Sequence, residues 1–546
     1  MAVKTYLAID QGAESGRGML GRFDGERLSV QEIYRYPNTM VKVHGHYYWD
    51  ILYLYREIKK TLSICAKQYT DHLDGIGIDN WSVDFGLLDK NGELLGFPYA
   101  YRDPKNNDML EEGFKRISRK KIYQITGIQL LHFNTAFQML ALRLMNSTAL
   151  ESAAIFLFMA DIFNYFLTGV KKAEFSVVSG SQLYDNNKYQ WSKEIFDSFE
   201  IPFTIAPEVI DPGTVIGELL THIKDETGVK SAKVIAPLTH DTGSAIFAVP
   251  TEGEDWACCS SGTWSVMGSI EKRPIITEQS YLYNFTNEGG LNRSVRFLKN
   301  IMGLWLIQRL KRDWEKEGCS YTYSEITEMA SKAKPFKAII NPNDMSFYNP
   351  DNMSEAIIDF CKKTGQEIPE TKGELARISL EGLALSYRWV SNMLGEIKGK
   401  PTKGLNIVGG GSRNRLLSQM TADCLQKPVI TGPVEATAIG NILVQAVADK
   451  AIANPEECKE IIKNSLELEL REMKKRNPER NDIKFRVLQQ FISELQNQSF
   501  KAAFDKLSEP HKHAIITRLE NQAEHMGGCV PYNFIKTLER ELYGVT

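Results

Sequence analysis

Asp241 is the residue of this chain whose position is most suggestive of chemistry. It lies in the run Thr239–Ala245, between the apolar segments 234–238 and 246–249, a pattern typical of a turn from a strand into a helix. A carboxylate at such a turn can accept a proton from a substrate hydroxyl while that oxygen attacks a phosphorus atom. Asp241 can instead cap a helix starting at Thr242, a role worth about 1 kcal/mol. His240 beside it can hydrogen-bond a substrate or serve as a structural histidine.

Two turns rich in glycine and hydroxyl residues could bind phosphate groups. They span residues 10–17 and 260–265. Glycines allow backbone N–H groups to approach an anion closely, and Thr263 adds a hydroxyl to the second turn. Each turn taken alone also fits an ordinary hairpin, and the later run 409–411 fits either an anion site or a flexible loop. A phosphate-binding loop of the Gly-x-x-x-x-Gly-Lys-[Ser/Thr] type is absent. A base together with two such turns predicts a kinase.

Two further groups of residues fit this chemistry. Asp10 ends a predicted strand and precedes the first glycine turn, which suits a carboxylate directed at Mg²⁺ or its water shell; the alternative is an ordinary turn aspartate. The segment 80–85 and the run 101–103 combine aromatic and polar side chains suited to a sugar. Their alternative role is a core tryptophan with charged residues at the surface.

Repeated α/β elements must position these residues. Residues 5–34 predict three short strands, followed by a helix over 49–67 and strands over 75–79 and 84–88. Strands over 256–260 and 264–268 begin a second unit. A helix over 376–397 and a strand over 405–408 continue it. The sequence therefore predicts a duplicated α/β fold with a hinge near Val249–Pro250 and a ligand cleft between the halves. Residues 500–544 predict charged helices of unidentified role.

The composition restricts the class of protein. The chain has 546 residues, a formal net charge of −3 and a pI of about 6.4, which favours several domains and gives no reason to expect nucleic acid or an anionic membrane as partner. Neither a signal peptide nor an uncharged run of about 18 apolar residues is found. The eight cysteines are scattered without metal-site spacing, so we expect reduced thiols and a cytoplasmic protein.

Taken together, these motifs resemble the FGGY carbohydrate kinases, and among them the members that act on L-rhamnulose. The resemblance runs from residue 5 to about residue 495. It rests on the following segments: 13–17, 127–129, 133–135, 239–244, 260–268, 298–305 and 432–436. Their order and spacing make the resemblance specific.

The resemblance implies two actin-like (ribonuclease H-like) α/β domains with an interdomain cleft. Residues 1–249 would form the N-terminal domain with the sugar site and the base, residues 250–495 the C-terminal, nucleotide-binding domain, and residues 496–546 a helical extension. The implied reaction converts ATP and L-rhamnulose, with Mg²⁺, into ADP and L-rhamnulose 1-phosphate, a step of L-rhamnose catabolism.

The resemblance also assigns roles to individual residues. Asp241 would be the proton acceptor, Ser82 and His240 would contact the sugar, and Asp10 would hold the metal. The implied ATP contacts are Ala13, Glu14, Ser15, Gly16, Arg17, Thr263, Asn300, Gln308 and Gly410.

Two positions depart from the pattern of the family. Ser82 stands where similar kinases have glycine, and a side chain there narrows the sugar pocket. Glu14 replaces a small hydroxyl residue and brings negative charge near the phosphates unless it points toward solvent or magnesium. A kinase for a related ketose, L-fuculose or xylulose, is thus the alternative enzyme. A nucleotide-gated sugar sensor is the non-catalytic alternative.

Overall fold

The computed structural model describes residues 3–250, 255–465 and 469–471. By their internal contacts these residues divide into two compact units. Unit 1 comprises residues 3–250, 269–299 and 432–465, and unit 2 comprises 255–268, 300–431 and 469–471. Unit 1 therefore draws on three separate parts of the chain. The predicted extension after residue 496 lies outside the described residues.

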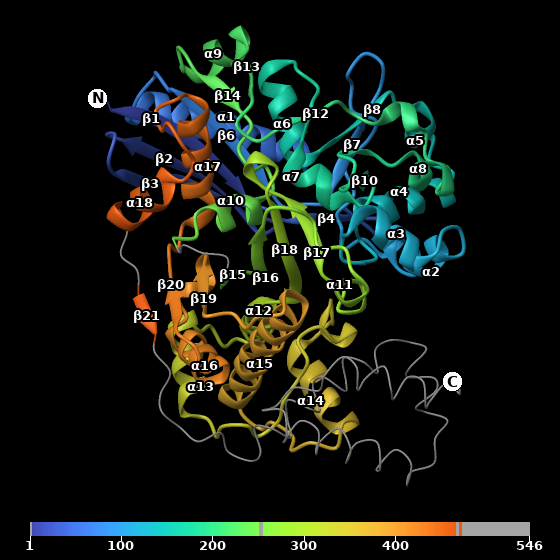
Figure 1. Cartoon of the computed structure of the whole chain (residues 1–546), viewed down its shortest axis with the longest axis vertical. Helices are drawn as coiled ribbons and strands as arrows, with labels where there is room; N and C mark the ends of the chain where they lie inside the picture. The colour runs from blue at the N-terminus through green and yellow to red at the C-terminus, as the bar shows by residue number, and fades with distance from the viewer. Residues whose placement is uncertain (1–2, 251–254, 466–468, 472–546) are drawn as a thin grey trace. The chain divides into compact units, whose positions relative to one another are not determined.

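A six-stranded sheet forms the centre of unit 1, in the order β13-β14-β6-β1-β2-β3 (Figure 1). The strands are β1 Lys4–Gln11, β2 Ser15–Phe23, β3 Leu28–Pro37, β6 Gly75–Asn80, β13 Val215–Glu218 and β14 Lys233–Ile235. Strands β1, β2 and β3 pair antiparallel, whereas β6 runs parallel to β1 and β14 parallel to β6. The predicted strands over 5–34 and 75–79 are confirmed. Residues 6–9 of β1 are all fully buried, as expected for a strand covered on both faces.

Helices cover this sheet, and each has a local cause in the sequence. Helix α1, Ile51–Gln68, confirms the helix predicted over 49–67. The Asp50 side chain caps it by accepting a hydrogen bond from the backbone N–H of Tyr53. Leu54, Ile58 and Leu62 recur every four residues and bury one face. Helix α17, Ala436–Ala448, comes from the far end of the chain and packs against β1, β6 and α10, Asp241–Phe247.

The remaining elements of unit 1 are short. The helices are α2 Met109–Phe114, α3 Arg119–Thr126, α4 Thr135–Leu144, α5 Thr148–Ser152, α6 Met159–Thr168, α7 Phe175–Val178, α8 Lys193–Ser198, α9 Thr221–Thr227, α11 Glu278–Leu282 and α18 Glu457–Ser465. The strands are β4 Met40–Val43, β5 His46–Trp49, β7 Phe85–Leu88, β8 Ile155–Phe158, β9 Ala173–Glu174, β10 Tyr184–Asp185, β11 Gln190–Trp191, β12 Val209–Ile210, β17 Thr286–Gly289 and β18 Val295–Met302, whose last residues belong to unit 2.

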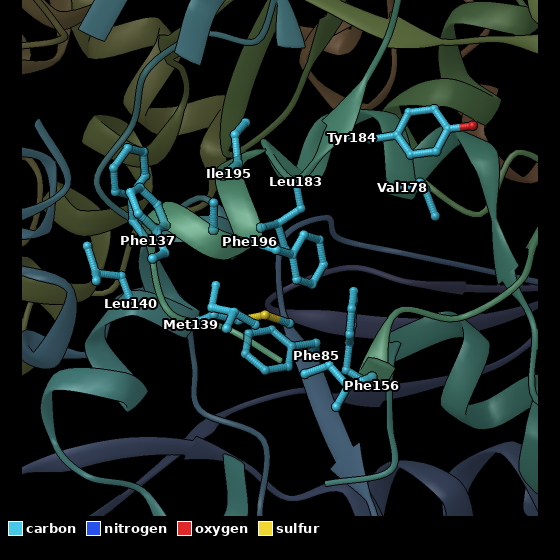
Figure 2. Packing of buried hydrophobic residues seen from close by; sticks show 14 of the residues in the cluster. Phe85, Phe137, Met139, Leu140, Phe156, Val178, Leu183, Tyr184, Ile195 and Phe196 are labelled. Atoms are coloured by element: carbon cyan, nitrogen blue, oxygen red, sulfur yellow. The ribbon is translucent and has the colours of Figure 1, made fainter. Parts of the chain in front are cut away.

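The segment predicted as a strand over 84–88 does not join the central sheet. It forms β7, which pairs antiparallel with β8 in a separate two-stranded sheet. Its side chains pack into a hydrophobic core of their own, in which Phe85 of β7 and Phe156 of β8 lie near Met139 of α4 and Phe196 of α8 (Figure 2). This core supports the loop between β6 and β7, which carries Ser82.

Unit 2 repeats the strand pairing of unit 1. Its strands lie in the order β16-β15-β19-β20-β21. They are β15 Trp256–Ser261, β16 Trp264–Glu271, β19 Gly404–Val408, β20 Val429–Thr431 and β21 Glu469–Arg471. Strands β15 and β16 form an antiparallel hairpin like β1 and β2, while β19 runs parallel to β15 and β20 parallel to β19. The predicted duplication of an α/β fold is confirmed.

Five helices accompany these strands among the described residues of unit 2. They are α12 Trp305–Lys316, α13 Tyr323–Lys332, α14 Met353–Lys363, α15 Lys372–Lys398 and α16 Arg415–Leu425. Helix α15 confirms the helix predicted over 376–397. It starts earlier because Thr371 and Glu374 form a capping box at its N-terminus.

None of the seven cysteines among the described residues forms a disulfide, and five of them are buried. This confirms the expectation of reduced thiols for that part of the chain. Within the same ranges, no helix is both long and apolar enough to cross a membrane.

Candidate active site

Three carboxylates gather at one edge of the unit 1 sheet. Asp10 and Asp79 are register partners near the carboxyl ends of the parallel strands β1 and β6. The backbone N–H of Asn80 donates to the carbonyl oxygen of Thr239 at 2.8 Å, which brings Asp241 to the same edge. Ligand sites of α/β sheets commonly form at this edge. Asp79 was not identified from the sequence, although it ends a predicted strand just as Asp10 does.

Asp241 opens helix α10, one residue before the predicted start, with His240 at the N-cap. Its Oδ1 accepts hydrogen bonds from the Thr242 backbone N–H at 2.5 Å and the Thr242 hydroxyl at 3.2 Å. The side chain remains 29% exposed. Burial raises the pKa of Asp241 and the charge of Asp10 raises it further, although His240 opposes them. A carboxyl with a raised pKa that still reaches solvent suits a general base.

His240 lies between two carboxylates. Its Nδ1 is 3.2 Å from Glu288 Oε2 and its Nε2 is 3.6 Å from Asp241 Oδ1. Arg296, almost fully buried, places Nη1 3.2 Å from the same Glu288 oxygen. Burial alone would raise the pKa of Glu288, but His240 and Arg296 outweigh it and the pKa is lowered. Glu288 was not identified from the sequence, although it directly precedes Gly289–Gly290 and so resembles the glycine turns that were.

A second buried carboxylate fixes the backbone that carries His240 and Asp241. Glu174 Oε2 accepts hydrogen bonds from the backbone N–H of Thr239 at 3.0 Å and from its hydroxyl at 2.6 Å. Glu174 also binds Ser176, whose Oγ accepts a hydrogen bond from the His240 N–H at 3.1 Å. These bonds hold residues 239–241 against the start of α7.

The loop that presents Ser82 is strained and tightly held. Val83 has a φ of 72°, a conformation that β-branched residues rarely adopt and that is commonly found at functional sites. Its carbonyl oxygen accepts a hydrogen bond from the Thr135 hydroxyl at 2.8 Å. The contact with α4 therefore stabilises a backbone conformation that Val83 would not adopt by itself.

Asp84 organises the aromatic side chains beside this loop. Its Oδ2 accepts hydrogen bonds from the indole N–H groups of Trp49 at 2.6 Å and Trp81 at 2.9 Å. Burial raises the pKa of Asp84 to about 6, against the opposing effect of these bonds and that from Gln138. The ring centroids of the two tryptophans lie 4.2 Å apart, and Trp81 is only 7% exposed. Trp81 is therefore a buried side chain, but the charged residues of this group, Asp84, Arg102 and Asp103, are buried as well and do not lie at the surface as the alternative supposed. The sugar contact stays a prediction.

Ser82 and Glu288 both border Gly180. A Cβ atom at Gly180 would lie 3.7 Å from Ser82 Oγ and 3.9 Å from Glu288 Cγ. Glu288 also contacts His240, so Gly180 and Glu288 lie between the two residues expected to contact the sugar, whose roles stay a prediction.

The first glycine turn connects β1 and β2 and is stabilised by hydrogen bonds of its own backbone and by Asn38. The Gly12 N–H donates to the Ser15 carbonyl oxygen at 3.0 Å, and the Asn38 amide donates to the Gly12 carbonyl oxygen at 2.9 Å. Arg17 pairs with both Asp10 and Glu435, the residue that precedes α17. The turn therefore places its backbone beside Asp10, while its residues 13–15 remain half-buried.

The expected nucleotide contacts of unit 2 lie around the second glycine turn. The Gly262 and Thr263 carbonyl oxygens accept hydrogen bonds from residues 303–305, at the start of α12, at 2.9–3.2 Å. Gln308 lies in the next turn of that helix, and its Oε1 is buried without a hydrogen-bond partner. Asn300 lies three residues before Gly303, on β18.

The triple glycine also lies at this turn. Gly409 has a φ of 83°, and a Cβ atom at Gly411 would lie 2.1 Å from Ser261 Oγ. Gly410 between them is exposed and has open space around its Cα. Residues 410–413 form a short 3₁₀ helix in place of a flexible loop. Unit 2 therefore brings Gly410 together with the Ser261–Thr263 turn.

A closed metal site is not found in the described ranges, where no three His, Cys, Asp or Glu side chains form a group that could hold an ion.

Comparisons with known proteins agree with this geometry. Residues 5–248 match the model of the N-terminal domain of the FGGY family of carbohydrate kinases, and residues 257–448 match that of its C-terminal domain. The chain is 41% identical over 465 residues to a Rhamnulokinase of Bacteroides thetaiotaomicron, covering 85% of this chain and 95% of the relative. It is 39% identical to a Rhamnulokinase of Oceanobacillus iheyensis, covering 85% and 97%.

Solved structures support the same fold. A ligand-bound xylulose kinase from Lactobacillus acidophilus superposes with a TM-score of 0.72 at 16% identity, covering 91% of this chain and 98% of that structure. The fold, the two domain matches and the relatives lead to one conclusion: the chain belongs to the FGGY family of carbohydrate kinases.

Proposed function

We propose that this chain transfers the γ-phosphoryl group of ATP to L-rhamnulose, giving ADP and L-rhamnulose 1-phosphate in L-rhamnose catabolism. The observation that carries the proposal is the 41% identity to a Rhamnulokinase over 95% of that relative. The 465 aligned residues cover 85% of this chain and therefore span the segments that carry Ser82, His240 and Asp241.

In this reaction Asp241 is the general base. It removes the proton of the sugar hydroxyl while that oxygen attacks the γ-phosphorus. The support is its place at the sheet edge, its partial exposure and its raised pKa. General bases contribute about 10²–10⁴-fold to rate. His240 and Ser82 hydrogen-bond the sugar and orient the reacting hydroxyl, and orientation supplies much of the remaining acceleration in phosphoryl transfer.

We assign the phosphate and nucleotide contacts to the two glycine turns. Residues 13–17 of unit 1 and Thr263 of unit 2 bind phosphate oxygens through backbone N–H groups, a hydroxyl and the Arg17 guanidinium. Asn300, Gln308 and Gly410 bind the nucleotide. The unpartnered Oε1 of Gln308 supports this, because a buried amide oxygen without a donor is costly unless a ligand supplies one.

The residues present fit Mg²⁺. Asp79 Oδ1 is buried without a hydrogen-bond partner beside Asp10, and Mg²⁺ binds through one or two carboxylates, water and substrate phosphates. Asp10 and Asp79 would hold the ion or its water shell. The ion, when bound, neutralises charge on the phosphate oxygens. In sequence, residues 1–249 and 250–495 remain the proposed sugar-binding and nucleotide-binding domains, although residues 269–299 and 432–465 pack with unit 1.

An ADP-release assay with the purified chain tests this function. L-rhamnulose, L-fuculose and xylulose are compared at equal ATP and Mg²⁺, and we expect the highest kcat/KM for L-rhamnulose. A tenfold preference for either of the other sugars would reassign the substrate within the family. Binding of sugar and ATP without ADP release from any ketose would instead indicate the non-catalytic sensor.

A further inference from the structure

Glu288 is a buried carboxylate beside His240, and the proposed function assigns it no role so far. It lies on β17, and its Oε2 faces both His240 Nδ1 and Arg296 Nη1, each at 3.2 Å. Its Oε1 accepts a hydrogen bond from the Thr286 hydroxyl at 3.3 Å. Neither 3.2 Å contact has the geometry of a formed hydrogen bond, so Oε2 is a buried carboxylate oxygen that lies beside an imidazole and a guanidinium and lacks a donor.

The neighbours of His240 determine which ring nitrogen carries the proton. A carboxylate oxygen can only accept, so the contact with Glu288 is favourable only when Nδ1 carries hydrogen. Arg296 nitrogens also lie 3.4 Å from Nδ1. However, its Nε donates to the Gly289 carbonyl oxygen at 2.9 Å, and its Nη2 to the Ser176 carbonyl oxygen at 3.3 Å. Glu288 Oε2 is charged, buried and without a donor at 3.2 Å from Nδ1, and the Nδ1–H tautomer is the one that supplies a donor to it.

With the proton on Nδ1, the neutral ring presents the lone pair of Nε2 toward Asp241, whose Oδ1 is 3.6 Å away. A lone pair there can accept a hydrogen bond from a sugar hydroxyl that lies beside Asp241.

We propose that Glu288 is a positioning residue of the phosphoryl transfer: it accepts the Nδ1 proton of His240 and thereby directs Nε2 toward Asp241 and the sugar. This inference rests on the proposed function. Glu288 acts through His240 and does not itself take part in the transfer.

The first test is spectroscopic and needs no substrate. In the full chain labelled with ¹⁵N-histidine at pH 8, His240 is assigned by comparison with His240→Gln, and its ¹⁵N shifts report the tautomer. We expect hydrogen on Nδ1 and none on Nε2. In Glu288→Ala we expect the population to move toward the Nε2–H form. A bare Nδ1 in the unsubstituted chain would overturn the proposal.

The second test is kinetic and separates positioning from folding. Glu288→Ala should lower kcat with L-rhamnulose at least about tenfold, the smaller end of the cost of losing a partner that orients a functional histidine, with the KM for ATP unchanged. Glu288→Gln should recover most of this loss, because its amide oxygen can accept from both His240 and Arg296 while its NH₂ group faces Thr286.

If Glu288 served only to neutralise the buried Arg296, the glutamine variant would be as impaired as the alanine variant; this result, or an unchanged kcat in Glu288→Ala, would contradict the proposal. Glu57→Ala is the matched control, since Glu57 on α1 is also buried and accepts a hydrogen bond from the hydroxyl of Tyr34 on β3. Failure of the unsubstituted chain to phosphorylate L-rhamnulose would refute the proposed function, while the tautomer measurement would still test the Glu288–His240 contact.

Discussion

Gly440 of α17 lies directly against the backbone of Ser244 in α10: a Cβ atom at position 440 would lie 1.9 Å from the Ser244 carbonyl oxygen. The two residues are far apart in sequence, yet their helices pack at the backbone. Since α10 begins with Asp241, this contact helps to hold the proposed base at the sheet edge. The next residue of α17, Asn441, binds the helix to β6 by donating a hydrogen bond to Asp79 Oδ2 at 2.5 Å.

Gly440→Ala is therefore expected to destabilise unit 1. The added methyl group must push two helix backbones apart, and overpacking of this kind costs about 1–3 kcal/mol or more. The free energy of unfolding in urea measures the effect. Gly217→Ala is the control, because its Cβ would lie at an ordinary 3.5 Å from Thr168. Equal stabilities of the two variants would show that the helices have room to separate.

Ser82→Gly should alter the choice of sugar. The Ser82 hydroxyl lies in the region of Glu288 and His240, so its loss removes a polar group and enlarges the space available to the sugar. A difference of this size in a fitted pocket is worth about 1–3 kcal/mol. We expect the ratio of kcat/KM for L-rhamnulose to that for L-fuculose to fall at least about fivefold on that scale. An unchanged ratio would remove Ser82 from the sugar site.

The pH profile should reflect the raised pKa of Asp241. A base must be deprotonated to act, so kcat is lost as the pH falls through that pKa. We expect the acid limb to have its midpoint above the ordinary aspartate value of about 3.9. A midpoint at or below that value would contradict the assigned environment of the base.

Acid unfolding caused by the titration of Asp84 does not account for a loss of kcat at low pH. Its pKa in the folded protein is raised to about 6, so its contribution to stability is present at low pH and is lost as the pH rises through 6. Circular dichroism over the same pH range provides the control for other groups.

Removal of the residues after Gln496 should leave the kinase activity within a few-fold of the full chain. Each residue assigned a chemical role precedes residue 442. The measurement is ADP release by the truncated chain, with its circular dichroism spectrum as the control for folding. A folded truncation that lacks activity would assign the extension a role in catalysis.

The elements of the fold were predictable where the sequence contains local patterns. Glycine turns between alternating strands predicted β1–β3 and the β15–β16 hairpin, and the apolar periodicity predicted α15. The separation of β7 from the central sheet was not predictable, because it depends on packing against β8 and α4. The same holds for α17, whose approach to α10 depends on a contact between Gly440 and Ser244 that no local pattern indicates.

The site was only partly predictable for a similar reason. Asp241, His240 and Asp10 stand next to recognisable strand ends and turns, so their residue types and positions were informative. Glu174 and Glu288 act through partners about 50–65 residues away in sequence, and the sequence does not indicate which carboxylates will be buried against which loops.

ADP release by Asp241→Asn with saturating L-rhamnulose and ATP tests the central claim most directly. Asparagine preserves the size of the side chain and can still accept the hydrogen bond from Thr242, but it cannot take up a proton at neutral pH. We predict a folded variant that binds sugar and nucleotide in calorimetry and releases ADP at least about 10²-fold more slowly, within the range for loss of a general base. Turnover within a few-fold of the unsubstituted chain would contradict the account, and would leave Asp241 as a helix-terminal residue only.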